Sequence, residues 1–157
     1  MRENYKEIPL LQQREIEARV MAPLIRAFCE AFGKEKTYEV VRNAMAKIAL
    51  ETGRRDAEKY GKGLDSFREN CLPTWDAHGA LKKEAKENTP ECCAFDVTYC
   101  AYANLYKELG VSEIGALVSC CRDLPYIQGF DDSIEFSRSK TIMEGCDCCD
   151  FCYKVKK

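Results

Sequence analysis

The spacing of apolar residues differs between the two halves of the chain, and this difference most limits the folds available to it. In the first half, large apolar side chains recur at every fourth position, at Ile16, Val20, Leu24, Phe28 and Phe32, with Met21 and Ile25 beside them. This spacing predicts an amphipathic helix with one apolar face, ending at Gly33. A second helix with a similar pattern is predicted from Tyr38 to Ala49, before the charged, glycine-bearing residues 53–63. The N-terminal half is therefore expected to be mainly helical.

Alternation with a period of two begins after Gly79. The side chains of residues 95–100 alternate between apolar and polar, which predicts a strand with two unlike faces. The apolar face carries Phe95, Val97 and Tyr99, and the polar face carries Asp96, Thr98 and Cys100. Residues 80–87 fit either an edge strand or a polar helix, and Asn88-Thr89-Pro90 is a turn signal. A hairpin is the interpretation that uses both segments.

A second hairpin is predicted near the C-terminus, where residues 134–143 and 149–155 alternate and are joined around Gly145. Between the hairpins, a helix is predicted over 101–109 and another from Ser112, which Pro125 bends or restarts. Helices followed by an antiparallel sheet of two hairpins, joined by a helical crossover, are typical of an α+β fold.

Length and composition predict how the chain is organised. With 157 residues and 46% hydrophobic content, it is expected to form a single domain over residues 1–157. Residues 1–78 are expected to be mainly helical, and residues 79–157 to form the sheet with its crossover helices. The 24 Lys and Arg balance 26 Asp and Glu without a basic block, so no nucleic acid partner is expected. A small-molecule substrate is the expected partner, and a homo-oligomer is left open.

Localisation is predicted from the N-terminus and from the cysteines. Residues 1–7 are charged and Pro9 interrupts the short apolar run that follows, so neither a signal peptide nor a membrane partner is expected. The eleven cysteines are odd in number and include adjacent pairs such as Cys92-Cys93 and Cys120-Cys121, which suit a disulfide framework poorly. Reduced thiols in the cytoplasm are therefore expected.

Four cysteines lie within seven positions near the C-terminus, at Cys146, Cys148, Cys149 and Cys152. Cys149 shares a strand face with Phe151 and Tyr153, so it is predicted to point inward as a small apolar side chain. The spacing C-x-C-C-x-x-C is not the paired C-x-x-C of a structural zinc site, and a strand would turn Cys149 and Cys152 to opposite faces. No cofactor is therefore expected, and zinc or iron held by cysteine thiolates is the alternative.

Single residues elsewhere also indicate chemistry. Cys100 directly precedes a predicted helix, whose dipole would lower the pKa of the thiol. Arg138 lies on the apolar face of its strand, where it either extends to water or grips an anion with its planar guanidinium. Asp123 is a candidate N-cap for the helix that Pro125 restarts. His78, the only histidine, has no nucleophile motif beside it and is expected at the surface.

Several short stretches of the second half occur in an order and spacing that resemble a known family. They contain Val97, Thr98, Cys100, Tyr102, Ala103, Cys120, Asp123, Arg138, Thr141, Gly145, Cys149, Asp150 and Phe151. These residues are similar to the V-T-x-C-x-Y-A, C-x-x-D, R-T-x-T and G-x-x-x-C-D-F stretches of the L-2-amino-thiazoline-4-carboxylic acid hydrolase family. The resemblance runs from about Gly79 to the C-terminus. Ser139 in place of threonine and Cys152 in place of a basic residue depart from the pattern.

The resemblance implies a hydrolase that opens a small cyclic amidine or thiazoline at a carbon–nitrogen bond, in cysteine-related metabolism. Such a reaction needs attack on the carbon between the ring sulfur and nitrogen, a proton donor for the leaving atom, and groups that hold the cationic amidine and the carboxylate. The residues expected to be catalytic are Cys100, Cys120, Asp123 and Cys149. The residues expected to bind substrate are Asp96, Thr98 and Arg138.

A binding module is the alternative from a different class. Small α+β domains of the 4-vinyl reductase type also end in a strand that carries glycine and cysteine. The chain resembles them in this respect, which implies a sensor that binds a small ligand or a metal through its thiols.

Overall fold

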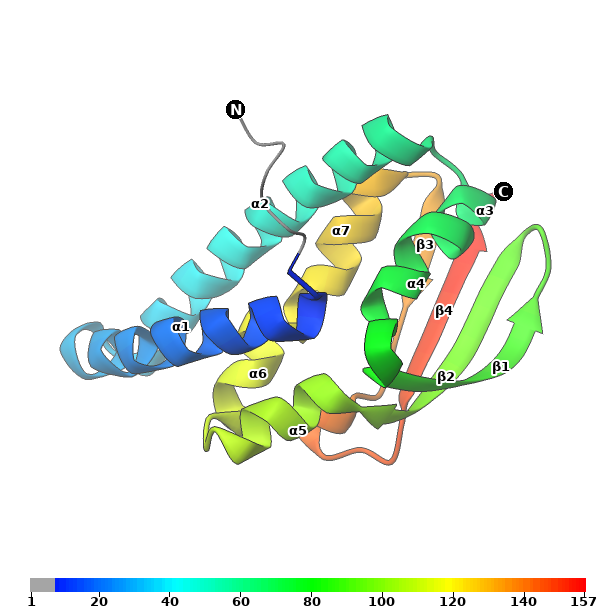
Figure 1. Ribbon diagram of the computed structural model, residues 1–157. Coiled ribbons are helices and arrows are strands. Elements are labelled where there is room, and N and C mark those ends of the chain that lie inside the picture. Colours follow the sequence, from blue (N-terminus) through cyan, green and yellow to red (C-terminus); the bar gives the residue numbers. More distant parts are fainter. Residues whose placement is uncertain (1–7) are drawn as a thin grey trace.

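The computed structural model describes residues 8–157 and confirms the α+β class, with helices first and a four-stranded antiparallel sheet after them (Figure 1). The N-terminal half consists of α1 (Leu10–Phe32), α2 (Lys34–Tyr60), α3 (Leu64–Ser66), a π-helical turn (Phe67–Cys71), α4 (Leu72–Trp75) and a 3-10 turn (Ala77–Gly79). Residues 1–7, whose charge contributes to the prediction of no signal peptide, lie outside the described part. No described helix is long and apolar enough to cross a membrane.

The second half contains both predicted hairpins. The strands are β1 (Leu81–Asn88), β2 (Cys92–Cys100), β3 (Ile134–Ser137) and β4 (Cys149–Val155), in the sheet order β1-β2-β4-β3. Residues 80–87 thus form an edge strand rather than a helix. The crossover consists of α5 (Ala101–Glu108), α6 (Ser112–Val118), a 3-10 turn (Cys120–Arg122) and α7 (Asp123–Phe130). Pro125 lies in the first turn of α7, where a proline costs no helical hydrogen bond.

Helix α2 runs further than the sequence predicted, and two glycines explain why. The prediction ended the helix before residues 53–63, whereas α2 continues to Tyr60 and crosses α7 closely. A Cβ atom on Gly53 would lie 2.1 Å from the backbone oxygen of Tyr126, and one on Gly129 would lie 2.1 Å from that of Leu50. Glycine at both positions lets the two backbones approach, so Gly53 is a packing residue and not a helix terminator.

Helix α1 turns a different face to the core from the one that its spacing predicted. The large side chains at every fourth position are exposed, from 48% for Phe28 to 63% for Phe32. The buried face consists of Ala18, Ala22 and Ile25, which pack with residues of α5 and α6. The predicted helix is therefore confirmed. Of its predicted apolar residues Ile25 is buried, whereas the residues at every fourth position are exposed.

A bulge in β2 overturns the predicted faces at the end of that strand. Lys82 pairs with Tyr99 but Lys83 pairs with Val97, which leaves Thr98 without a partner in β1. An extra residue of this kind reverses the alternation beyond it. Tyr99 is consequently exposed, whereas Cys100 packs against the core.

Strands β3 and β4 also differ in how well alternation predicted them. β4 has the predicted bounds, and Cys149, Phe151 and Tyr153 are buried on one face as expected. The strand predicted over 134–143 was too long, because β3 ends at Ser137 and residues 142–144 form a 3-10 turn that the Thr141 side chain caps. Arg138 therefore leaves the sheet instead of continuing along its face.

Candidate active site

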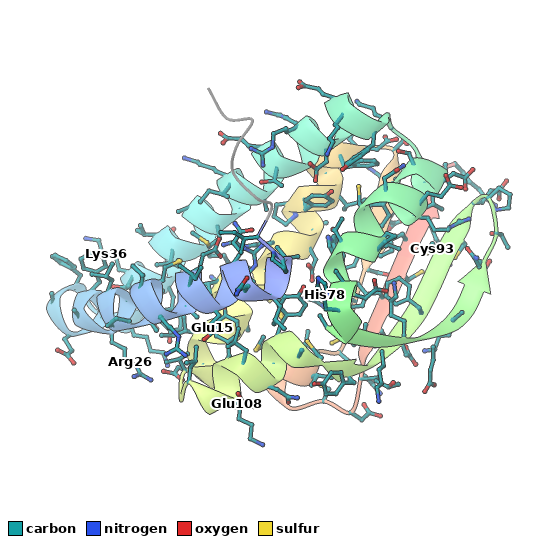
Figure 2. All side chains as sticks on the ribbon, in the orientation of Figure 1. Glu15, Arg26, Lys36, His78, Cys93 and Glu108 are labelled. Carbon is teal, nitrogen blue, oxygen red and sulfur yellow. The ribbon has the colours of Figure 1, made fainter. Side chains whose placement is uncertain are left out.

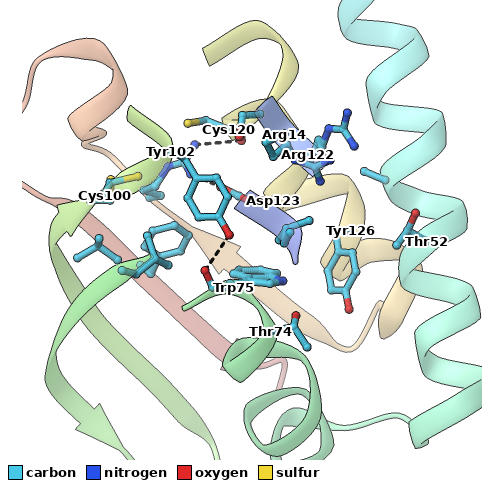
Figure 3. A pocket seen from close by; sticks show the side chains of 18 of the residues that line it. Arg14, Thr52, Thr74, Trp75, Cys100, Tyr102, Cys120, Arg122, Asp123 and Tyr126 are labelled. Carbon is cyan, nitrogen blue, oxygen red and sulfur yellow. Dashed lines mark hydrogen bonds and ion pairs between the residues drawn. The ribbon is translucent and has the colours of Figure 1, made fainter. Parts of the chain in front are cut away.

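A cavity of about 200 Å³ lies where α1, α2 and α7 meet the sheet (Figure 3). It has room for a small ring compound and is smaller than the roughly 300–1,000 Å³ typical of drug-sized ligand sites. Its lining comes from both halves of the chain, with charged or thiol side chains from Arg14, Asp56, Cys100, Cys120, Arg122, Asp123, Arg138 and Cys149. The cavity is therefore built by tertiary contacts between segments that are far apart in sequence.

All four residues expected to be catalytic line this cavity. Cys100 enters from the end of β2, and Cys149 from the start of β4. Cys120 enters from the 3-10 turn before α7, and Asp123 from the start of α7. Arg138 lines it as well, just after β3. The structure thus brings together five of the seven predicted site residues.

The other two, Asp96 and Thr98, lie outside the cavity. Asp96 is on the opposite face of β2 and forms an ion pair with Lys86 at 2.7 Å. Thr98 is the exposed bulge residue. The sequence placed Asp96, Thr98 and Cys100 on one polar face. The bulge turns Cys100 inward and so separates it from the other two.

Asp123 and Arg138 form an ion pair at the wall of the cavity. The Arg138 guanidinium donates to Oδ2 of Asp123 and, at 3.3 Å, to the backbone oxygen of Cys120. Its central carbon lies 5.3 Å from the ring centre of Phe151, a cation–π contact. Burial raises the pKa of Asp123 to about 6, although Arg138 opposes the shift. Asp123 begins α7 without capping it, so its alternative interpretation as an N-cap was wrong.

Two of the three thiols of the cavity accept local hydrogen bonds from the backbone. Sγ of Cys100 caps α5 by accepting from the backbone N–H of Ala103 at 3.4 Å. Sγ of Cys149 accepts from the backbone N–H of Ile142 at 3.2 Å. Burial raises the pKa of Cys100, Cys120 and Cys149, to about 11 for Cys149. The predicted low pKa of Cys100 was wrong, because burial outweighs the backbone N–H groups of α5.

A second cluster of charges at the cavity was not predicted from the sequence. Arg14 and Arg122 both donate to Oε2 of Glu17, at 2.7 and 3.0 Å, and both arginines are largely buried. The signal that could have found Arg14 is its position four residues before Ala18, on the buried face of α1. It was missed because the exposed apolar face was taken as the inner one.

Aromatic side chains form much of the remaining wall. The hydroxyl of Tyr102 donates to the backbone oxygen of Trp75 at 2.9 Å, and that of Tyr126 donates to Asp56 at 2.8 Å. Figure 3 shows Tyr102 beside Asp123, with Cys100 on one side of the view and Thr52 on the other. The site thus combines an apolar, aromatic enclosure with an acid, several cations and protonated thiols.

The remaining cysteines of the C-terminal segment do not line the cavity. Cys146 is exposed, while Cys148 and Cys152 are half-buried, and Cys152 lies opposite Ala94 on the outer face of the sheet. Within residues 8–157, no three His, Cys, Asp or Glu side chains gather closely enough to hold a metal ion. All eleven cysteines are free. His78, which Figure 2 labels, is exposed, as expected.

Asp150, the residue after Cys149, holds the loop that delivers Arg138. Its carboxylate accepts from the backbone N–H groups of Ser139 and Lys140, at 2.9 and 2.6 Å, and from the Ser139 hydroxyl at 2.6 Å. Burial acts to raise its pKa, but these hydrogen bonds prevail and lower the pKa to about 2. The two adjacent residues Cys149 and Asp150 therefore belong to the cavity and to its support, respectively.

The family model for L-2-amino-thiazoline-4-carboxylic acid hydrolase matches residues 13–153. The chain belongs to this family. The match confirms the resemblance and extends it, because it includes α1 and α2 and so covers Arg14, which lies outside the stretch from Gly79 onward.

No curated protein matches this hydrolase-family chain. Among solved structures, it is similar to the phenol-responsive sensory domain of the transcription activator PoxR, crystallised with phenol. The sequence identity is 16% and the TM-score is 0.46, with 96% of this chain and 77% of that chain covered.

Proposed function

We propose that this protein is a cytoplasmic hydrolase that opens a small cyclic amidine of the 2-amino-thiazoline-4-carboxylate type. The observation that carries the proposal is the convergence of Cys100, Cys120, Asp123, Arg138 and Cys149 on one small cavity. Membership of the hydrolase family supports it, and the eleven free thiols suit a reducing compartment.

Asp123 is suited to hold the amidine and to accept a proton. Arg138 bonds to Oδ2, which leaves Oδ1 for the substrate. With a pKa of about 6, Asp123 is mainly ionised at neutral pH and is basic enough to take a proton from water. In this role it orients a water molecule toward the carbon between the ring nitrogen and sulfur, while its negative charge stabilises the cationic amidine.

The thiols are suited to donate protons. Their raised pKa values keep them protonated at neutral pH, so a resting thiolate nucleophile is disfavoured. After water adds to the ring carbon, one ring bond of that carbon breaks and the leaving atom needs a proton. Cys100 and Cys149 border the same cavity as Asp123 and supply an S–H group there.

The test is a ring-opening assay of the purified, reduced protein with 2-amino-thiazoline-4-carboxylate, following the gain of one water by mass spectrometry. Asp123→Asn is expected to lower kcat/KM by about a hundredfold or more, and Cys100→Ala to lower it substantially. Cys152→Ser, on the outer face of the sheet, is the matched control and should keep full activity.

Full activity of both cavity variants would overturn the assignment of residues. Binding of the substrate by the wild-type protein without any ring opening would instead favour the sensor alternative. Because both outcomes are read on the same preparation, the two functions are separated directly.

A further inference from the structure

The arginine pair of the cavity carries more positive charge than its protein partner neutralises. Arg14 and Arg122 both bond to the single carboxylate of Glu17, whereas the carboxylate of Asp123 bonds to Arg138. The side chains of Arg14 and Arg122 are only 12% and 13% exposed. A mostly buried cation without a full counter-charge is unfavourable unless an anion joins it.

Arg14 uses fewer of its guanidinium N–H groups in hydrogen bonds to the described residues than Arg122 does. Arg122 is tied to the backbone oxygen of Val118 at 2.7 Å and to the sulfur of Met45 at 3.2 Å, in addition to Glu17. Within residues 8–157, the Arg14 side chain hydrogen-bonds to Glu17 through Nη1 alone. The hydroxyl of Tyr106 is fully buried without a hydrogen-bond partner and interacts electrostatically with both arginines. The polar groups around the two arginines are therefore incompletely satisfied.

We propose that Arg14, supported by Arg122, binds the carboxylate of a small substrate. The inference rests on the proposed function and adds an orientation to it. A guanidinium grips a carboxylate with two parallel hydrogen bonds, and Arg14 faces the same cavity as Asp123. A zwitterionic ring compound then lies with its cationic end at Asp123 and its anionic end at Arg14. Arg138, which was also expected to bind substrate, is paired with Asp123.

Calorimetry with two non-reacting probes tests this subsite, namely thiazolidine-4-carboxylate and its uncharged carboxamide. Wild-type protein is expected to bind the carboxylate at least tenfold more tightly than the carboxamide. Arg14→Gln should remove that preference without weakening the carboxamide, and Arg14→Lys should restore part of it. Arg54→Gln, an exposed arginine of α2, is the matched control and should behave as wild type.

Equal binding of the two probes by wild-type protein, or an unchanged preference in Arg14→Gln, overturns the subsite. The outcome is independent of catalysis, because neither probe needs to be hydrolysed. A protein that shows the preference but opens no ring would retain the subsite and lose the proposed hydrolase function.

Discussion

Strand β4 and helix α1 are both strongly patterned, yet only β4 buries the face that its pattern predicted. A strand has two faces, and in β4 one carries Cys149, Phe151 and Tyr153 while the other carries Asp150 and Cys152. Helix α1 has apolar residues on two faces, one with large side chains and one with Ala18, Ala22 and Ile25. The small face is the buried one.

The contrast teaches that size, as well as polarity, decides which helix face is inside. Alanines allow α1 to lie close to the helices beneath it, since the distance between packed helices depends on the side chains at the contact. The bulky face would hold those helices apart, and it is left for solvent or for a partner. In β4 the distance to the neighbouring strands is set by backbone hydrogen bonds and does not depend on side-chain size. Large side chains can therefore point inward.

The largest expected effect comes from the buried face of β4. Phe151→Ala removes a ring stacked on Phe95, with 5.3 Å between ring centres, and should lower the free energy of unfolding by about 3–5 kcal/mol. Leu24→Ala on the exposed face of α1 should change the stability of the monomer by only about 0.5 kcal/mol. Urea unfolding at low protein concentration measures both, and equal losses would contradict the contrast between the two elements.

A smaller effect is expected from filling the small face of α1. Ala22 is 3% exposed, and Ala22→Leu should cost about 1–3 kcal/mol through overpacking. Ala27→Leu, on the exposed face of the same helix, is the control and should not destabilise the protein. Thermal unfolding of the two variants compares the faces directly. An unchanged unfolding temperature for Ala22→Leu would contradict the close packing of this face.

The raised pKa of Asp123 predicts a pH dependence of catalysis. The proposed role requires the carboxylate, which predominates above its pKa of about 6. We therefore expect kcat/KM to fall about tenfold per pH unit below pH 6 and to level off above it. The residual activity of Asp123→Asn should lack this acidic limb. A wild-type profile that stays flat down to pH 5 would exclude the carboxylate as the essential base.

The smallest expected effect is at Asp150, on the outer face of β4. Asp150→Asn weakens the hydrogen bonds to Ser139 and Lys140 and should cost about 1 kcal/mol at neutral pH. Because folding lowers the pKa of Asp150, its stabilisation is present above pH 4 and is lost as the pH falls from about 4 to 2. Unfolding measured across that range should show a smaller decline in the variant than in the wild type, and parallel declines would contradict the assignment.

Much of the candidate site was predictable because its residues lie in short, ordered stretches of the second half. Cys100, Cys120, Asp123, Arg138 and Cys149 were named from those stretches, and the structure places them around one cavity. Asp96 and Thr98 were misplaced because the alternation of apolar and polar residues does not reveal a bulge. The bulge depends on how β1 pairs with β2. Arg14 was missed because the orientation of α1 is a tertiary property.

The sequence by itself determined the fold class, both hairpins, the bounds and faces of β4, and the family. These features follow from local periodicity, turn residues and short motifs, which act over a few residues. Only the tertiary structure decided which face of α1 is buried, how far α2 extends past Gly53, and where Cys100 points. Each of these depends on the distance between elements that are far apart in the chain, and that distance is set by the packing of both partners.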